Sequence, residues 1–174
     1  MYSVIRLLAI TAILFHGAIF GFFYAWICST MWGLDTTSPE IAIAAMQAMN
    51  ASVRNITFAP AFFATPAISL LTAILCLIHA QRIPGMWFGA AGLVYLFGGL
   101  TLTMSINVPM NEALATVAVP NLATDAAQVW ADYSAPWQFW NQMRTIFSGI
   151  ALVMTAIGLL ALGRSMHHTA TTTA

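Results

Sequence analysis

The hydrophobic positions of this chain gather into four long apolar stretches separated by shorter polar segments. Each stretch approaches or exceeds the roughly 20 residues that an α-helix needs to cross a bilayer. The first follows Arg6 and is much longer than a signal-peptide core of about 7–15 residues, so we predict that it is retained. The pattern predicts an all-α integral membrane four-helix bundle, formed as a single domain over residues 1–166, with spans at about 5–28, 58–80, 85–106 and 139–163.

The connectors between these stretches carry helix signals of their own. Residues 81–84 are few enough to join the second and third spans as an antiparallel hairpin. In the first outer connector, Ser38 is suited to an N-cap, Pro39 to the first helical position and Glu40 to the first turn. We therefore expect a helix that runs from there to about Arg54.

The second outer connector carries a similar signal. Residues 125–133 are expected to be helical, and Pro136 is expected to mark the start of the fourth long helix. The polar C-terminal tail, 167–174, is expected to be disordered.

Composition supports a lipid environment and excludes one class of partner. Hydrophobic residues make up 60% of the chain, the mean hydropathy is +0.84, and only five basic and five acidic side chains occur. A compact domain of this composition has no water-soluble surface, so membrane lipid is its expected surrounding. Lysine is absent and the net charge is zero, so the chain lacks the cationic surface that a nucleic acid requires.

The arginines predict an orientation. With a cytoplasmic N-terminus, Arg6, Arg82 and Arg164 all fall at cytoplasmic span ends, which is the positive-inside pattern. We therefore predict that both termini are cytoplasmic, in a bacterial inner membrane. The acidic residues all fall in the two outer connectors, and Arg54 and Arg144 lie on that side without an explanation from topology.

Near the outer side, the start of the fourth span has one polar and aromatic face. Trp137, Trp140, Asn141 and Arg144 are spaced at i, i+3, i+4 and i+7, so they share a helical face. Two interpretations remain open. The residues form an interfacial aromatic belt with a snorkelling arginine, or they form the wall of a functional site.

Two further polar stripes lie on the same side. Asn107 and Asn111 flank a proline and precede Glu112, and they either satisfy the carbonyl that the proline frees or serve a site. Asn50 and Arg54 continue the predicted connector helix and either face solvent or face the same site. If the three stripes converge, they form a pocket for a planar, apolar, oxygen-bearing molecule that arrives from the membrane.

His16 lies near the middle of the first span. It is either a neutral buried histidine bonded to a helix carbonyl or a group that transfers protons.

Together these motifs resemble the DUF1772 or anthrone oxygenase-like family. The resemblance rests on an Asn-Val-Pro-x-Asn element combined with a Trp-x-x-Asn-x-x-Arg element, here Asn107 to Asn111 and Trp137 to Arg144, with Trp130 and Tyr133 between them. It extends over most of the chain and implies a four-helix membrane protein, in agreement with the span pattern.

The resemblance also implies a chemistry. The family oxidises anthrones to anthraquinones with molecular oxygen, without a metal or flavin. The resemblance therefore implies that the chain is an oxygenase that needs no cofactor. Donors would steady an enolate, stacking rings would hold the substrate, and a base would remove a proton. The candidate donors are Arg144, Asn141, Asn107 and Asn111. The candidate rings are Trp137 and Trp140, with Asn50, Arg54 and His16 as further substrate-binding residues. The candidate bases are Glu112, Asp132 and His16.

A second hypothesis uses the same residues without catalysis. They would tie the outer connectors to the bundle, or hold a lipid or quinone, in a subunit of a homo-oligomer or a larger membrane complex.

Overall fold

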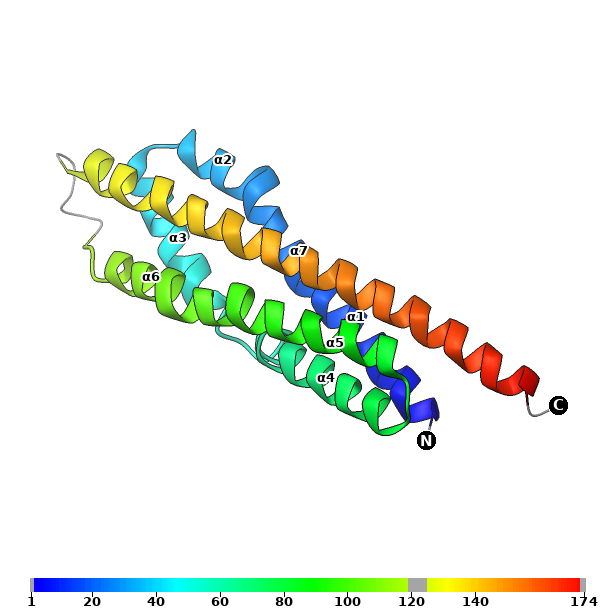
Figure 1. Cartoon of the computed structure of the whole chain (residues 1–174). Helices are drawn as coiled ribbons and strands as arrows, with labels where there is room; N and C mark the ends of the chain where they lie inside the picture. The colour runs from blue at the N-terminus through cyan, green and yellow to red at the C-terminus, as the bar shows by residue number, and fades with distance from the viewer. Residues whose placement is uncertain (1, 119–124, 173–174) are drawn as a thin grey trace.

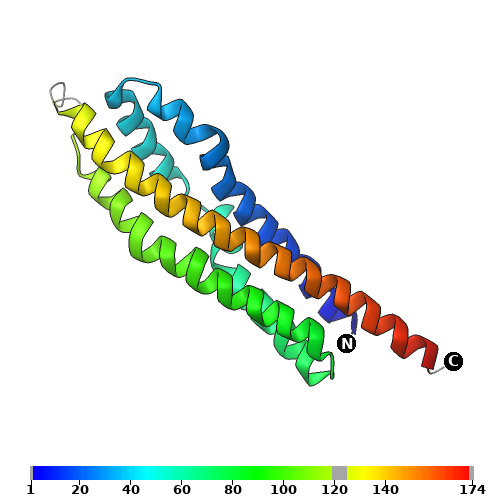
Figure 2. The same cartoon turned by 45° about the horizontal axis from the view of Figure 1, so that its top comes forward.

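The computed structural model describes residues 2–118 and 125–172, with residues 2 and 166–172 described by their backbone alone. The long helical runs lie side by side in both views, and the two termini lie at the same end (Figures 1 and 2). The first run consists of α1 (Tyr2–Ala25), η1 (Trp26–Thr30) and α2 (Met31–Asp35). The second is α4 (Phe58–Ile78), preceded by the short helix α3 (Pro39–Ser52). The third consists of α5 (Arg82–Tyr95), η2 (Leu96–Thr101), η3 (Thr103–Asn107) and α6 (Val108–Ala115), and the fourth is α7 (Ala126–Thr172).

The bundle is held together by pairwise packing around a closed square. α1 contacts α4 and α7, and α5 contacts the same two helices from the opposite corner. Buried side chains such as Phe23, Phe88 and Tyr95 fill the interior, whereas large apolar side chains such as Leu71 and Leu160 face outward. An apolar outer surface is stable in lipid, so packing and exposure both agree with a membrane bundle.

In the described part of the chain, four helices are long and apolar enough to cross a membrane, which confirms the predicted all-α membrane fold. The chain is an integral membrane protein. These helices cover Ser3–Asp35, Phe58–Ile78, Arg82–Ala115 and Ala126–Ser165. Three of them run well past the predicted ends, because backbone hydrogen bonds continue a helix into a polar segment that hydropathy assigns to a connector.

The outer connectors are helical, with two differences from the prediction. α3 begins at Pro39 after an extended Ser38, as expected, but the Ser38 side chain makes no capping hydrogen bond. Pro136 does not start a helix, because it lies inside the continuous helix α7. The backbone of α7 is also helical to Thr172, within the tail that we predicted to be disordered, and residues 173 and 174 lie outside the described part of the chain.

Gly98 permits the close approach of η2 to α7 and gives a test of the packing. A Cβ at this position would overlap the Cβ and ring of Phe147, whereas a Cβ at Gly17 would have no heavy atom within 4 Å. We expect Gly98→Ala to lower the free energy of unfolding by about 1–3 kcal/mol, because overpacking forces neighbours to shift. Gly17→Ala should be neutral or slightly stabilising. Equal unfolding curves for the two variants, measured in mixed detergent micelles, would show that η2 and α7 do not pack in this way.

Candidate functional site

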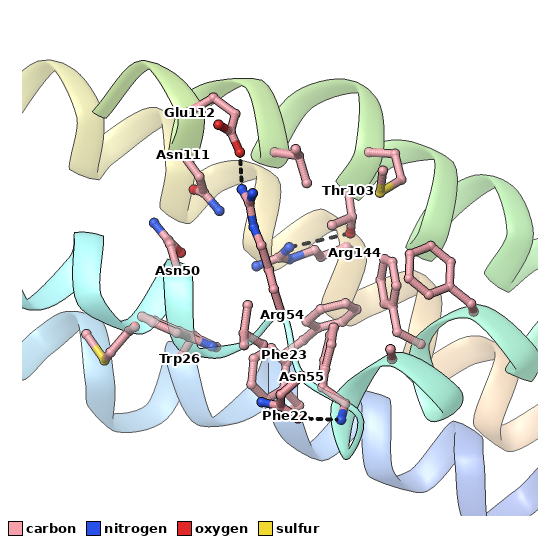
Figure 3. Close-up of a pocket in the computed structure, with 18 of the residues that line it drawn as sticks. Phe22, Phe23, Trp26, Asn50, Arg54, Asn55, Thr103, Asn111, Glu112 and Arg144 are labelled. Carbon is pink, nitrogen blue, oxygen red and sulfur yellow. Dashed lines mark hydrogen bonds and ion pairs between the residues drawn. The ribbon is translucent and has the colours of Figure 1, made fainter. Parts of the chain in front are cut away.

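A cavity of about 550 Å³, drawn in close-up in Figure 3, is lined by residues toward the end of the bundle opposite the termini. Its volume is within the range of about 300–1,000 Å³ that small-molecule sites occupy. Aromatic and aliphatic side chains form most of its wall, and a few polar side chains point into it. The main lining residues are Phe22, Phe23, Trp26, Met49, Asn50, Arg54, Phe58, Phe62, Phe63, Thr103, Met104, Val108, Asn111, Glu112, Trp137 and Arg144.

Two π-helical segments shape this cavity. η1 contributes Trp26, and η3 contributes Thr103 and Met104. A π-turn holds an extra residue relative to an α-turn, so it changes which side chains face inward, and such turns are frequent at functional sites. Their position here indicates that the local helix distortion serves the shape of the cavity.

Arg144 is the central charged group of the cavity. Its side chain is 4% exposed, and its Cζ atom lies 4.3 Å from the ring centroid of Phe23 and 5.1 Å from that of Trp137. Its Nε donates to Asn141 Oδ1 at 3.0 Å, and its Nη1 donates to Thr103 Oγ1 at 3.4 Å, a contact visible in Figure 3. These contacts offset part of the cost of burying a guanidinium.

The described residues provide no carboxylate partner for this buried charge. Glu112, the carboxylate that lines the cavity, is paired with Arg54 instead. The Nη2 group of Arg144 also has no hydrogen-bond acceptor within the described ranges, although the residue lines the cavity. A buried guanidinium with a free donor favours a ligand that carries a negative or partly negative oxygen.

Asn111 and the aromatic residues of α7 form a second polar network. Asn111 Oδ1 accepts hydrogen bonds from Tyr133 Oη and from Trp137 Nε1, each at 2.8 Å. Asn50 Nδ2 lies 3.5 Å from Tyr133 Oη. The network fixes the Trp137 ring, which is 1% exposed and stands next to Arg144. It therefore joins α3, α6 and α7 around the cavity.

Arg54 and Glu112 form an ion pair across one mouth of the cavity, as Figure 3 shows. Their side chains are 61% and 53% exposed, so this mouth is polar and open. Arg54 follows the end of α3 and Glu112 lies on α6, so the pair connects the two outer connectors. An exposed pair of this kind contributes only about 0–1 kcal/mol to stability, which leaves it free to open.

Two hydrogen-bond clusters outside the cavity hold the outer helices in place around it. Asp35 accepts from Trp130 Nε1, Ser134 Oγ and Gln138 Nε2, at 2.8–2.9 Å, and so ties α2 to α7. Gln47 donates to the carbonyl oxygens of Leu114 and Val117, which ties α3 to α6. Both clusters hold the short outer helices against the long ones.

The structure brings together six of the eleven residues that the sequence suggested for the site. Each of these lines the cavity: Asn50, Arg54, Asn111, Glu112, Trp137 and Arg144. Asn141 lies behind the wall, where it holds Arg144 and donates to the Phe23 carbonyl at 3.2 Å.

Asn107, Trp140 and His16 do not line this cavity. Asn107 is fully buried, and both polar atoms of its amide lack a hydrogen-bond partner among the described residues. Trp140 is half-buried and packs edge-on against Phe139. His16 is fully buried, shares a 2.9 Å hydrogen bond with Ser69 Oγ and lies edge-on to the ring of Tyr95.

Of the three candidate bases, Glu112 alone lines the cavity. Asp132 is exposed on α7, where it accepts a hydrogen bond from Gln128. It lines a different and more open pocket. Within the described ranges, no group of three or more His, Cys, Asp or Glu side chains is arranged to hold a metal ion.

Sequence reasoning did not single out the aromatic side of the cavity. Phe22, Phe23 and Trp26 of the first run and Phe58 and Phe62 of α4 form much of the wall. The dense aromatic spacing in residues 20–26 was the available signal, but in a membrane span the same residues are also suited to face lipid. Nothing in the sequence around Thr103 indicated that its hydroxyl would accept a hydrogen bond from Arg144.

The comparison with protein families decides the relationship. A model described as anthrone oxygenase matches residues 53–154, which is more than half of the chain. The chain belongs to the anthrone oxygenase family. This confirms the resemblance drawn from the asparagine and tryptophan motifs. Searches of curated proteins and of solved structures found no match.

The matched region divides the cavity into two parts. It contains Thr103, Asn111, Glu112, Trp137 and Arg144, which are the polar groups of the third and fourth runs. The aromatic wall from α1 and η1, and Asn50 on α3, precede it in the chain. Most of the polar side chains that line the cavity thus fall inside the match.

Proposed function

We propose that this protein is an oxygenase that oxidises a planar, apolar, ring-containing substrate of the anthrone type, bound in the cavity around Arg144. The observation that carries the proposal is the buried Arg144 guanidinium, which has aromatic rings on its faces and no carboxylate partner among the described residues. Such a group suits an enolate oxygen next to a flat ring system. Membership of the anthrone oxygenase family supports the same chemistry.

The proposed reaction uses molecular oxygen as its second substrate. Glu112 takes one proton from the ring methylene, which leaves an enolate, and the enolate passes an electron to oxygen. The substrate radical and the superoxide that result combine through a new carbon–oxygen bond. The peroxide that forms is then protonated. Loss of the second methylene proton breaks the oxygen–oxygen bond, so the ring gains a carbonyl and the other oxygen leaves as water. The substrate supplies all four electrons.

The residues of the cavity have separate roles in this scheme. Arg144 donates to the enolate oxygen as charge develops there, and Asn141 and Thr103 hold its guanidinium in place. Trp137 and Phe23 stack on the rings of the substrate. Glu112 acts as the general base at the cavity mouth, where its carboxylate pairs with Arg54.

We also propose that both termini face the cytoplasm of a bacterial cell, so that the cavity lies toward the outer half of the inner membrane. The arginines at span ends on the side of the termini support this orientation.

Oxygen uptake by the purified protein tests the activity directly. We expect vesicles that contain the protein to consume one oxygen molecule per anthrone and to yield anthraquinone and water, faster than vesicles without protein. An oxygen electrode and the product absorbance measure both quantities. Uptake equal to the protein-free background would reject the oxygenase and leave the second hypothesis, a protein that binds a lipid or quinone without reaction.

A further inference from the structure

Two apolar side chains of the cavity wall are also exposed on the surface of the bundle. Phe63 and Met104 line the cavity and are also 54% and 44% exposed on the outer surface of the bundle. Phe63 lies in the first turns of α4, and Met104 lies in η3. Their exposure indicates a second mouth between these two elements, besides the one at the ion pair.

Both residues lie inside the segments that can cross the membrane. Phe63 belongs to the span Phe58–Ile78, and Met104 belongs to Arg82–Ala115. Other large apolar residues are exposed on the same helical runs, including Leu71 on α4 and Phe97 on η2, which are 46% and 64% exposed. A surface of this kind faces acyl chains rather than water.

The two mouths differ in what they admit. Arg54 and Glu112 make the first mouth charged, which is unfavourable for an uncharged ring system. Phe63 and Met104 make the second mouth apolar, and behind it the aromatic wall leads to Arg144. An apolar molecule dissolved in the bilayer can therefore move from lipid to the guanidinium without crossing an aqueous surface.

We propose that the gap between Phe63 and Met104 is a lateral gate through which the protein takes an uncharged aromatic substrate directly from the bilayer. This inference deepens the proposed function and rests on its substrate class. The ion pair at the other mouth then serves exchange of water and protons with the aqueous side.

A lipid-dissolved photoreactive probe tests the gate without any turnover. The protein is placed in phosphatidylcholine vesicles that contain a small apolar aryl diazirine, which is activated by light and located by mass spectrometry. We expect at least fivefold more label on Phe23 and Trp137 than on Phe88 and Tyr95, although all four are at most 1% exposed. The first two line the cavity and the last two do not.

A blocked gate gives the decisive comparison. In a chain with Cys28→Ser and Cys76→Ala, Met104→Cys is reacted with N-cyclohexylmaleimide, and Phe97→Cys is treated in the same way as the matched control. Both positions are exposed and apolar, but Phe97 does not line the cavity. We expect the block at position 104 to lower the label on Phe23 and Trp137 at least fivefold, and the block at position 97 to leave it unchanged.

Two results would overturn the gate. One is label on the cavity residues no higher than on Phe88 and Tyr95, and the other is an equal effect of the two blocks. Because the probe needs neither oxygen nor anthrone, a gate that passes this test stands even if oxygen uptake fails. If the protein consumes oxygen with anthrone but its cavity residues are not labelled, the gate is rejected and the proposed oxygenase function stands.

Discussion

Replacing Arg144 with methionine should lower kcat for anthrone oxidation by about 10²–10³-fold, the usual effect of removing a donor that stabilises a developing oxyanion. Methionine keeps most of the side-chain length and its packing against Phe23 and Trp137, but it removes the charge and every N–H group. Initial rates from an oxygen electrode give kcat, and quenching of tryptophan fluorescence by anthraquinone gives the affinity for a product-like ligand.

Arg144→Lys is the matched variant for this experiment. It keeps the charge but loses the planar guanidinium that reaches both Asn141 and Thr103, so its kcat should lie between those of the wild type and Arg144→Met. If Arg144→Met turns over like the wild type, Arg144 does not stabilise the reaction. If it only lowers thermal stability, with an unchanged rate for the folded fraction, the structural hypothesis for this arginine is favoured.

The second large effect is expected at Glu112. Glu112→Gln should lower kcat by about 10²–10⁴-fold, because the amide has nearly the same shape but cannot accept the methylene proton. The affinity for anthraquinone should change little, since binding rests on the aromatic wall and Arg144. Stability should also change little, because the ion pair with Arg54 is more than half exposed.

Asp132→Asn is the control for Glu112. Asp132 is an acidic residue on the same side of the bundle, but it is exposed and does not line the cavity around Arg144. We expect its oxygen uptake to match the wild type. A normal rate for Glu112→Gln together with a loss for Asp132→Asn would show that Glu112 is not the base. The reaction would then take place outside the cavity around Arg144.

The spans themselves could be predicted because a bilayer imposes a simple rule. About 20 apolar residues are needed to satisfy every backbone group within lipid, and this requirement is visible in the sequence. The ends of the helices do not follow that rule. α6 and the first part of α7 remain helical where the chain becomes polar, and Pro136 is accommodated within α7 rather than at its start.

The site was predictable in part for a similar reason. Trp137, Asn141 and Arg144 share one face of a regular helix, so sequence spacing placed them together, and all three are buried. Asn107 and Asn111 share a spacing too, but Asn107 lies at the end of η3. Its amide is buried without a partner among the described residues, while Asn111 faces the cavity. A π-turn changes the direction of side chains relative to α-helical counting, so spacing alone did not separate them.

By itself, the sequence determined that this chain lies in a membrane, how many times it can cross it, and which polar residues share a helical face. Those properties follow from hydropathy and from local helix geometry, which depend on neighbouring residues only. The tertiary structure decided that Phe23 from the first run and Thr103 from the third meet Arg144 from the fourth. It also decided that Glu112, and not Asp132 or His16, lines the same cavity. These contacts join residues far apart in the chain, and they exist only because the packing of the four runs fixes which faces meet.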